Sequence, residues 1–342
     1  MSIENSDKYI VLDNAAIGYS GKTSAVKTVK SDISVFALKG ELVALIGENG
    51  VGKSTLLRTI AGFHPPVKGD VTICGREIGS YREKELALLM SFVSTEIIRV
   101  PNLSVFDLVS LGRYPHTNWF GRLLEEDEYL IEEAIRSVGL NGYENRMVNH
   151  LSDGERQKAM IARTLAQNTD IIVLDEPTAF LDLSNKYEIV HILHQLASEK
   201  GKTILFSTHD LTTALAEADR LWMMLKETVE QGAPEDLILK GSFDAIFQSK
   251  HLYFDQEKGD FRIWKQTKRT AHVTGQGLAL DWTIKALVRN GFEVIDSPEQ
   301  STVLISVNYP EWTINHLSGQ NKFDSLLSLC RFLILNEKKV YL

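Results

Sequence analysis

The feature that most constrains the fold is an apolar run that leads into a glycine-rich turn and then a helix. Residues 41–47, ELVALIG, are almost continuously apolar, which is typical of a strand buried on both faces of a parallel sheet. The next stretches predict a tight turn, GENGVGKST at 47–55, and a helix, STLLRTIAG at 54–62. Further strands of this sheet are predicted at 171–175 (IIVLD), 203–207 (TILFS) and 221–225 (LWMML). The expected class is therefore α/β.

The length of 342 residues predicts about two domains. Residues 8–265 alternate β-rich and helical stretches, and 125–138 has the apolar spacing of a helix with one charged face. We interpret residues 96–155 as a helical subdomain inserted into the α/β core. Residues 266–342 predict a small α+β domain with the order β-α-β-β-α. We expect three of its aromatic side chains to fill its own core: Trp282, Trp312 and Phe332.

Charge and composition argue against several partners. The formal net charge is −8 and no Lys/Arg block is present, so no nucleic acid is expected as a main partner. No apolar run approaches the roughly 20 residues that span a bilayer, and residues 1–14 are too acidic and polar for a signal peptide. The only cysteines, Cys74 and Cys330, fit a reducing compartment and are expected to act as small hydrophobic residues.

The glycine-rich turn carries the spacing G-x-x-x-x-G-K-[ST], which predicts a phosphate-binding P-loop between its strand and its helix. Backbone N–H groups and the helix N-terminus would attract the phosphates. We expect Lys53 to reach the β- and γ-phosphates of ATP, Ser54 to bind Mg²⁺ and Thr55 to contact the inner phosphate. The predicted nucleotide-binding residues here are Gly47, Asn49, Gly50, Gly52, Lys53, Ser54 and Thr55.

Two adjacent carboxylates, Asp175 and Glu176, follow the strand predicted at 171–175. Such a pair is usually a solvated turn, but a P-loop in the same chain favours a catalytic role. Asp175 would then hold Mg²⁺ through water, and Glu176 would act as the general base on the attacking water. The expected catalytic residues are Glu176, Lys53 and, from the resemblance given next, His209.

The order of the motifs over residues 8–265 resembles that of the ATP-binding cassette (ABC) ATPases. The P-loop is followed by LSDGE at 151–155, VLDEP at 173–177, FLD at 180–182 and STHD at 207–210. The resemblance implies a P-loop ATPase core that binds ATP and Mg²⁺ and forms a head-to-tail dimer with a second copy of itself.

The resemblance also implies roles for single residues. Ser152 and the amide of Gly154 would complete the ATP site of the other copy, and Asp182 would link the two sites. His209 would contact the γ-phosphate. Tyr19 matches the aromatic residue that stacks on adenine, with a tyrosine packed in the core as the alternative.

Two positions depart from the family. Asp153 replaces a glycine, and its carboxylate would repel a γ-phosphate unless it turns away as a helix N-cap, which is what we expect. Thr95 stands where the family has a glutamine that reaches Mg²⁺ and the attacking water. Because Thr95 is shorter, we expect Glu96 or a water molecule to substitute.

The stretch LVSLGRYPH, residues 108–116, resembles importers of iron-siderophore, haem and cobalamin. It implies an ATP-hydrolysing motor bound peripherally to the cytoplasmic face of the inner membrane, with Arg113 and His116 near integral-membrane permease subunits. An extracytoplasmic substrate-binding protein would act indirectly. Ferric siderophore is the expected cargo, with haem or cobalamin as alternatives. An exporter motor, a non-transport ABC ATPase and an ATP-dependent interaction protein remain rival functions, and residues 266–342 would be a regulatory sensor or a dimer prop.

Overall fold

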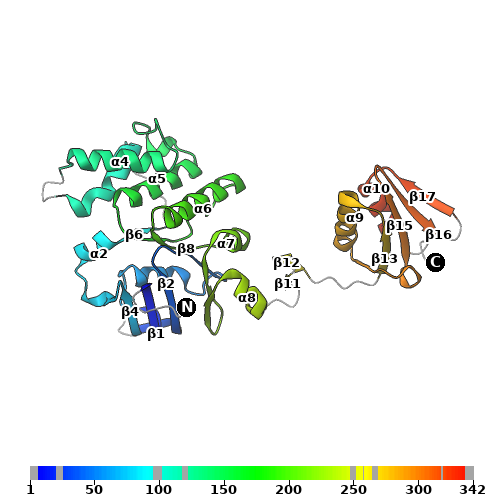
Figure 1. Ribbon diagram of the computed structural model, residues 1–342, viewed down its shortest axis with the longest axis horizontal. Coiled ribbons are helices and arrows are strands. Elements are labelled where there is room, and N and C mark those ends of the chain that lie inside the picture. Colours follow the sequence, from blue (N-terminus) through cyan, green and yellow to red (C-terminus); the bar gives the residue numbers. More distant parts are fainter. Residues whose placement is uncertain are drawn as a thin grey trace. The chain divides into compact units, whose positions relative to one another are not determined.

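The computed structural model describes residues 7–20, 26–94, 102–117, 122–246, 252–256, 258–263, 269–316 and 319–335. The chain divides into two compact units, Met1–Ser249 with Tyr253–Phe261, and Lys250–Leu252 with Arg262–Leu342. Figure 1 labels many of their helices and strands.

The strands of the first unit are β1 (Lys8–Ser20), β2 (Val26–Leu38), β3 (Leu42–Gly47), β4 (Lys68–Ile73), β5 (Arg76–Glu77), β6 (Met90–Val93), β7 (Ile171–Leu174), β8 (Thr203–Ser207), β9 (Arg220–Met224) and β10 (Val229–Gly232). Its helices are α1 (Lys53–Ile60), α2 (Glu83–Leu89), α3 (Val105–Ser110), α4 (Glu125–Ser137), α5 (Asp153–Ala166), α6 (Leu183–Ser198), α7 (Leu211–Glu217) and α8 (Pro234–Lys240). The strands β11 (Leu252–Asp255) and β12 (Asp260–Ile263) pair as a two-stranded sheet, and the division of the chain into units falls within both strands.

The central sheet has the strand order β10-β9-β3-β8-β7-β6, in which only the pairing of β10 with β9 is antiparallel. Every residue of β3 is buried. Leu42, Ala44 and Ile46 face one hydrophobic cluster, and Val43 and Leu45 face the other. The four strands predicted from apolar runs are confirmed, because a strand covered on both faces must be apolar throughout.

A second, antiparallel sheet with the order β2-β1-β4-β5 was not predicted from the sequence. The register between β1 and β2 shifts several times, so the alternation of polar and apolar residues is broken. Helix α1 contributes Leu56, Leu57 and Ile60 to the cluster that also contains residues of this sheet and of the central sheet. This packing anchors α1 and thereby fixes the turn that precedes it.

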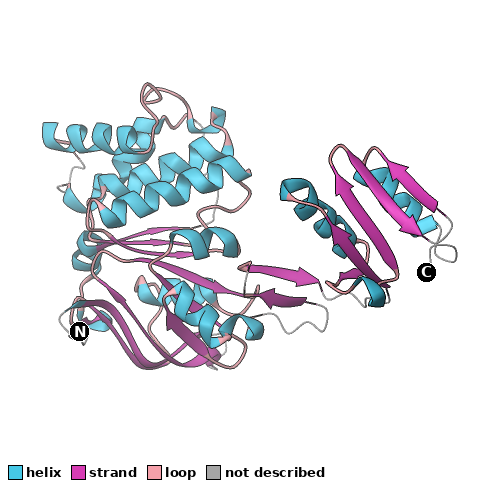
Figure 2. Cartoon of the chain, turned by 45° about the vertical axis from the view of Figure 1, so that its right-hand side comes forward, coloured by secondary structure: helices cyan, strands magenta, loops and turns pink. Residues whose placement is uncertain are grey.

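Helices α3, α4 and α5 pack together as a helical subdomain, and α4 confirms the helix predicted at 125–138. Their buried residues belong to the cluster on the other face of the central sheet. Figure 2 shows these helices beside the strands of the first unit. Among the residues described, no helix is both long and apolar enough to cross a membrane.

The second unit consists of β13 (Arg269–Thr274), α9 (Gly277–Arg289), β14 (Phe292–Val294), β15 (Val303–Asn308), β16 (Glu311–His316), β17 (Gly319–Phe323) and α10 (Leu326–Leu335). Its five strands form one sheet with the order β14-β13-β15-β16-β17, seen in Figure 2. The predicted order β-α-β-β-α omitted the hairpin of β16 and β17, whose polar residues, especially GQNK at 319–322, conceal its period.

Two of the three aromatic residues expected in this small core lie there. Trp312 is 5% exposed and donates from Nε1 to Thr283 Oγ1 at 2.7 Å, and Phe332 packs partly buried against the same cluster. Trp282 does not: it is 54% exposed, and the ammonium of Lys285 lies 4.5 Å from its ring centre. The prediction for Trp282 is wrong, because its position on α9 faces solvent.

Candidate nucleotide-binding and catalytic site

The turn after β3 depends on glycine at two positions. Gly47 has φ 153°, and a Cβ there would lie 2.5 Å from the carbonyl oxygen of Met224. Gly52 has φ 112° and caps the N-terminus of α1, and a Cβ there would lie 2.8 Å from Val29 Cγ1. Asn49 and Gly50 between them are exposed. The backbone is thus free to approach an anion at the N-terminus of α1.

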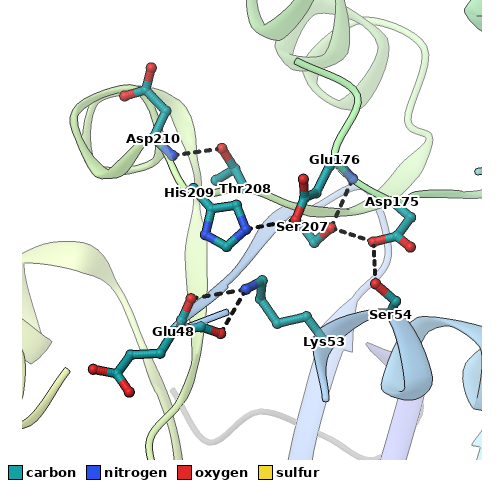
Figure 3. A network of polar contacts seen from close by, with 10 residues as sticks. Glu48, Lys53, Ser54, Asp175, Glu176, Ser207, Thr208, His209 and Asp210 are labelled. Atoms are coloured by element: carbon teal, nitrogen blue, oxygen red, sulfur yellow. Dashed lines mark hydrogen bonds and ion pairs between the residues drawn. The ribbon is translucent and has the colours of Figure 1, made fainter. Parts of the chain in front are cut away.

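Lys53, the first residue of α1, folds back over this turn. Its Nζ donates to the carbonyl oxygens of Gly47 at 2.9 Å and Glu48 at 3.0 Å, as Figure 3 shows. Burial lowers the pKa of Lys53, an effect that the charges of Glu176 and Asp175 partly oppose. The ammonium is therefore held in the turn by carbonyl groups that a bound phosphate could replace.

Asp175, directly after β7, accepts two hydroxyl hydrogen bonds on the same oxygen. Ser54 Oγ lies 3.1 Å from Asp175 Oδ1, and Ser207 Oγ donates to that oxygen at 2.8 Å. Asp175 is 3% exposed, whereas Ser54 is exposed. The carboxylate at the end of β7 is thus brought against the first turn of α1.

Glu176 adopts a left-handed backbone conformation with φ 48°, which is uncommon outside glycine. Its N–H donates to Ser207 Oγ at 2.8 Å, and its Oε1 lies 2.6 Å from His209 Nε2. The side chains of His209 and Glu176 are 41% and 30% exposed, so solvent reaches the pair. Figure 3 shows Lys53, Ser54, Asp175, Glu176 and His209 gathered at one place.

Ser207 is the residue of this network that the sequence did not single out. It ends β8, is fully buried and contacts both Asp175 and Glu176. Its place at the carboxyl end of a predicted parallel strand, two residues before His209, was a signal that could have found it.

The LSDGE and FLD residues lie at two helix N-termini. Ser152 is the N-cap of α5 and accepts from Glu155 N, and Asp182 is the N-cap of α6 and accepts from Asn185 N. Gly154 lies against Asn185, because a Cβ on Gly154 would be 2.7 Å from that side chain. The beginnings of α5 and α6 are therefore in contact.

Asp153 does not cap α5, so this prediction is wrong. Ser152 takes the cap, and Asp153 becomes the first residue of the helix. Its Oδ1 instead accepts from Arg156 Nη1 at 3.0 Å, and its side chain is 64% exposed. The carboxylate is paired with a cation on its own helix.

The remaining predicted residues have different outcomes. Tyr19 is 46% exposed, which excludes the alternative of a core tyrosine. Arg113 is 6% exposed and pairs with Asp127, so its guanidinium is not exposed for contact with a permease, and its position near one stays a prediction. His116 is exposed, and its Nε2 lies 2.8 Å from the carbonyl oxygen of Gln167. Thr55 is half-buried on α1. Thr95 and Glu96 lie outside the described residues.

A P-loop on a parallel sheet, with an Asp-Glu pair and a histidine at the ends of neighbouring strands, defines a nucleotide-binding ATPase. The comparisons with known proteins agree. Residues 31–179 match the ABC transporter family model, and residues 268–334 match the iron ABC transporter C-terminal domain. The chain belongs to the ATP-binding proteins of ABC transporters, which are ATPases.

Individual relatives span most of the chain. The uncharacterised ABC transporter ATP-binding protein MJ0873 of Methanocaldococcus jannaschii is 35% identical over 83% of this chain and 97% of its own length. The ferric enterobactin transport ATP-binding protein FepC of Escherichia coli (strain K12) is 36% identical over 72% of this chain and 92% of its own. A solved dimer of the ATP-binding cassette MJ0796 with ADP and Pi has a TM-score of 0.56 and 27% identity, covering 66% of this chain and 98% of that one.

Proposed function

We propose that this protein is the ATP-hydrolysing motor subunit of an ABC importer for ferric siderophores. The match of residues 268–334 to an iron transporter domain and the similarity to a ferric enterobactin transport protein support this cargo. The stretch LVSLGRYPH supports an importer of the same branch. Haem and cobalamin remain the alternative cargoes.

The residues around the P-loop suit the binding of ATP with Mg²⁺. The N–H groups of the turn from Gly47 to Thr55, including Asn49 and Gly50, would hold the phosphates, and Lys53 would leave its two carbonyl acceptors for the β- and γ-phosphates. Ser54 Oγ and Asp175 Oδ1 are oxygen ligands 3.1 Å apart, which is the donor chemistry that Mg²⁺ prefers. We assign the metal to Ser54 directly and to Asp175 through water. When bound, Mg²⁺ would neutralise phosphate charge.

Hydrolysis would depend on Glu176 and His209. Glu176 would take a proton from the attacking water, and its exposed edge and its position beside the P-loop lysine suit that task. His209, now 2.6 Å from Glu176, would turn toward the γ-phosphate and stabilise its charge. Catalysis would thus come mainly from positioning and charge stabilisation.

We infer that two copies assemble head to tail around two ATP molecules, an arrangement supported by the solved dimer of a related cassette. Ser152 and Gly154 would contact the ATP of the other copy, Asp182 would join the two sites and Tyr19 would stack on adenine. Residues 8–265 would form this motor and residues 266–342 a separate domain. Permease subunits, fed by an extracytoplasmic substrate-binding protein, would recruit the motor to the cytoplasmic face of the inner membrane.

The observation that carries the proposal is the cluster of Lys53, Ser54, Asp175, Glu176 and His209 at one end of the central sheet. Its test is the uptake of labelled ferric siderophore, haem and cobalamin in cells whose only copy is wild type, Glu176→Gln or the control Glu199→Gln. Glu199 is an exposed residue at the end of α6 and loses the same charge.

Uptake of ferric siderophore by wild type and Glu199→Gln, but not by Glu176→Gln, is the expected result. If Glu176→Gln selectively loses uptake of haem or of cobalamin, that compound would replace ferric siderophore as the proposed cargo. Equal uptake of all three in every strain would overturn the importer proposal and favour an exporter motor or a protein that does not transport.

A further inference from the structure

The hydroxyl of Ser207 occupies a position between the two carboxylate residues of the site. Ser207 Oγ donates its one proton to Asp175 Oδ1 at 2.8 Å and accepts the N–H of Glu176 at 2.8 Å. The side chain is fully buried, so no water competes for either hydrogen bond. The donor and acceptor functions of this hydroxyl are therefore both fixed by the protein.

The strand pairing explains why a hydroxyl is needed here. In the ladder between β7 and β8, Leu174 is the last residue of β7 and pairs with Phe206. The N–H of Asp175 then bonds to β6, through Val93, and the N–H of Thr208 bonds to β3, through Leu45. The β7–β8 ladder ends at the pair of Leu174 and Phe206, and beyond it the side chain of Ser207 supplies the acceptor for the N–H of Glu176.

The same hydrogen bond holds Glu176 in an unusual backbone conformation. Glu176 has φ 48°, which a residue with a Cβ adopts only where its surroundings over-determine it. This conformation directs the carboxylate to 2.6 Å from His209, which lies two residues after Ser207 on the same segment. One hydroxyl therefore sets the geometry between the Asp175 carboxylate, the Glu176 backbone and the histidine loop.

We propose that Ser207 is a positioning residue for ATP hydrolysis, which acts by holding Asp175 and Glu176 in their reactive geometry. The inference rests on the proposed function, because it requires Glu176 to be the base. Ser207 does not touch nucleotide in this account, so its loss would lower kcat rather than the affinity for ATP.

The test is the steady-state hydrolysis of ATP by the purified whole chain, with kcat and KM measured separately. Ser207→Ala is expected to lower kcat roughly 10-fold or more, since small misplacements of reacting groups are costly, while KM for ATP stays within about 2-fold of wild type. The matched control is Thr203→Val, which removes another fully buried hydroxyl from the opposite end of β8. It is expected to leave kcat unchanged even if it lowers the melting temperature.

A double-mutant cycle with Glu176→Gln distinguishes a positioning role of Ser207 from a general loss of structure. If Ser207 acts through Glu176, the double variant Ser207→Ala with Glu176→Gln should turn over no more slowly than Glu176→Gln alone, because residues that act as a unit are not additive. An equal further loss in the double variant would overturn the inference, as would a wild-type kcat in Ser207→Ala. A wild type that turns over no faster than Glu176→Gln would instead overturn the proposed function.

A variant that still fills the space of the hydroxyl covers the case in which Ser207→Ala does not fold. Ser207→Cys replaces the hydroxyl with a weak hydrogen-bonding thiol. The same fall in kcat at unchanged KM is expected for the folded protein, and a wild-type kcat would overturn the inference.

Discussion

Arg113→Ala removes one member of a buried ion pair that joins three parts of the helical subdomain. Arg113 Nε donates to Asp127 Oδ1 at 2.8 Å, and Nη1 donates to the carbonyl oxygen of Ala166 at 2.9 Å. The two charged side chains are 7% and 9% exposed. Removing one partner of such a pair costs about 3–5 kcal/mol, because the remaining charge is buried without compensation. We expect a loss of this size.

The assay is urea unfolding of the whole chain, combined with hydrogen exchange of peptides from α4 and α5, which reports the stability of the subdomain itself. Arg136→Ala is the control, because Arg136 is exposed on the last turn of α4, and we expect a change within about 0.5 kcal/mol. The double variant Arg113→Met with Asp127→Leu leaves no charge unpaired. Its free energy of unfolding should therefore be close to that of wild type. Equal stability losses in Arg113→Ala and Arg136→Ala would refute the reasoning.

The dependence of stability on acidic pH tests the same ion pair in a second way. Burial alone would raise the pKa of Asp127, but the hydrogen bond from Leu124 N–H and the bond and charge of Arg113 outweigh it and hold that pKa below its ordinary value. The stability from this carboxylate is therefore complete above about pH 4, the ordinary pKa of aspartate, and is lost as the pH falls through the lowered pKa. The double variant should lack this part of the acid dependence.

Three further outcomes follow from single contacts. Gly52→Ala should abolish binding of a fluorescent ATP analogue, because its Cβ would meet Val29 Cγ1 at 2.8 Å in a left-handed backbone; unchanged affinity would contradict the account of the turn. Ser152→Ala removes the N-cap of α5 and should cost about 1 kcal/mol in thermal unfolding, whereas an unchanged melting temperature would show that the cap is not needed. Trp312→Phe removes the buried hydrogen bond to Thr283 and should destabilise the second unit by about 1–3 kcal/mol in urea, an effect that a transition identical to wild type would disprove.

The central sheet was predictable because both of its faces are covered, so β3, β7, β8 and β9 had to be apolar runs. The antiparallel sheet was not, because the shifts in register between β1 and β2 remove the regular alternation that would mark them as strands. The edge strand β17 was also not predicted, because its polar residues lack a regular alternation with apolar ones. The local sequence pattern therefore predicts strands whose burial is uniform, as in β3, or alternates regularly, as in β15.

The P-loop was predictable because its glycines mark a tight turn, in which Gly47 and Gly52 have positive φ angles. The burial of Arg113 was not predicted because its partner, Asp127, comes from another helix, and sequence spacing does not reveal whether a charge is paired and buried. Asp153 was misjudged because two polar residues competed for one cap, and Ser152 has the geometry for it. The sequence pattern could not predict the burial or the capping role of residues whose contacts depend on other parts of the fold.

The central claim is that this chain hydrolyses ATP with Glu176 as the general base. Its most direct test is the steady-state turnover of ATP with Mg²⁺ by the purified wild type, Glu176→Gln and Glu199→Gln, with nucleotide binding measured in parallel. Glu176→Gln is expected to lose about 100-fold or more in kcat and still to bind ATP, while Glu199→Gln matches wild type. Turnover by Glu176→Gln at the wild-type rate would contradict the claim.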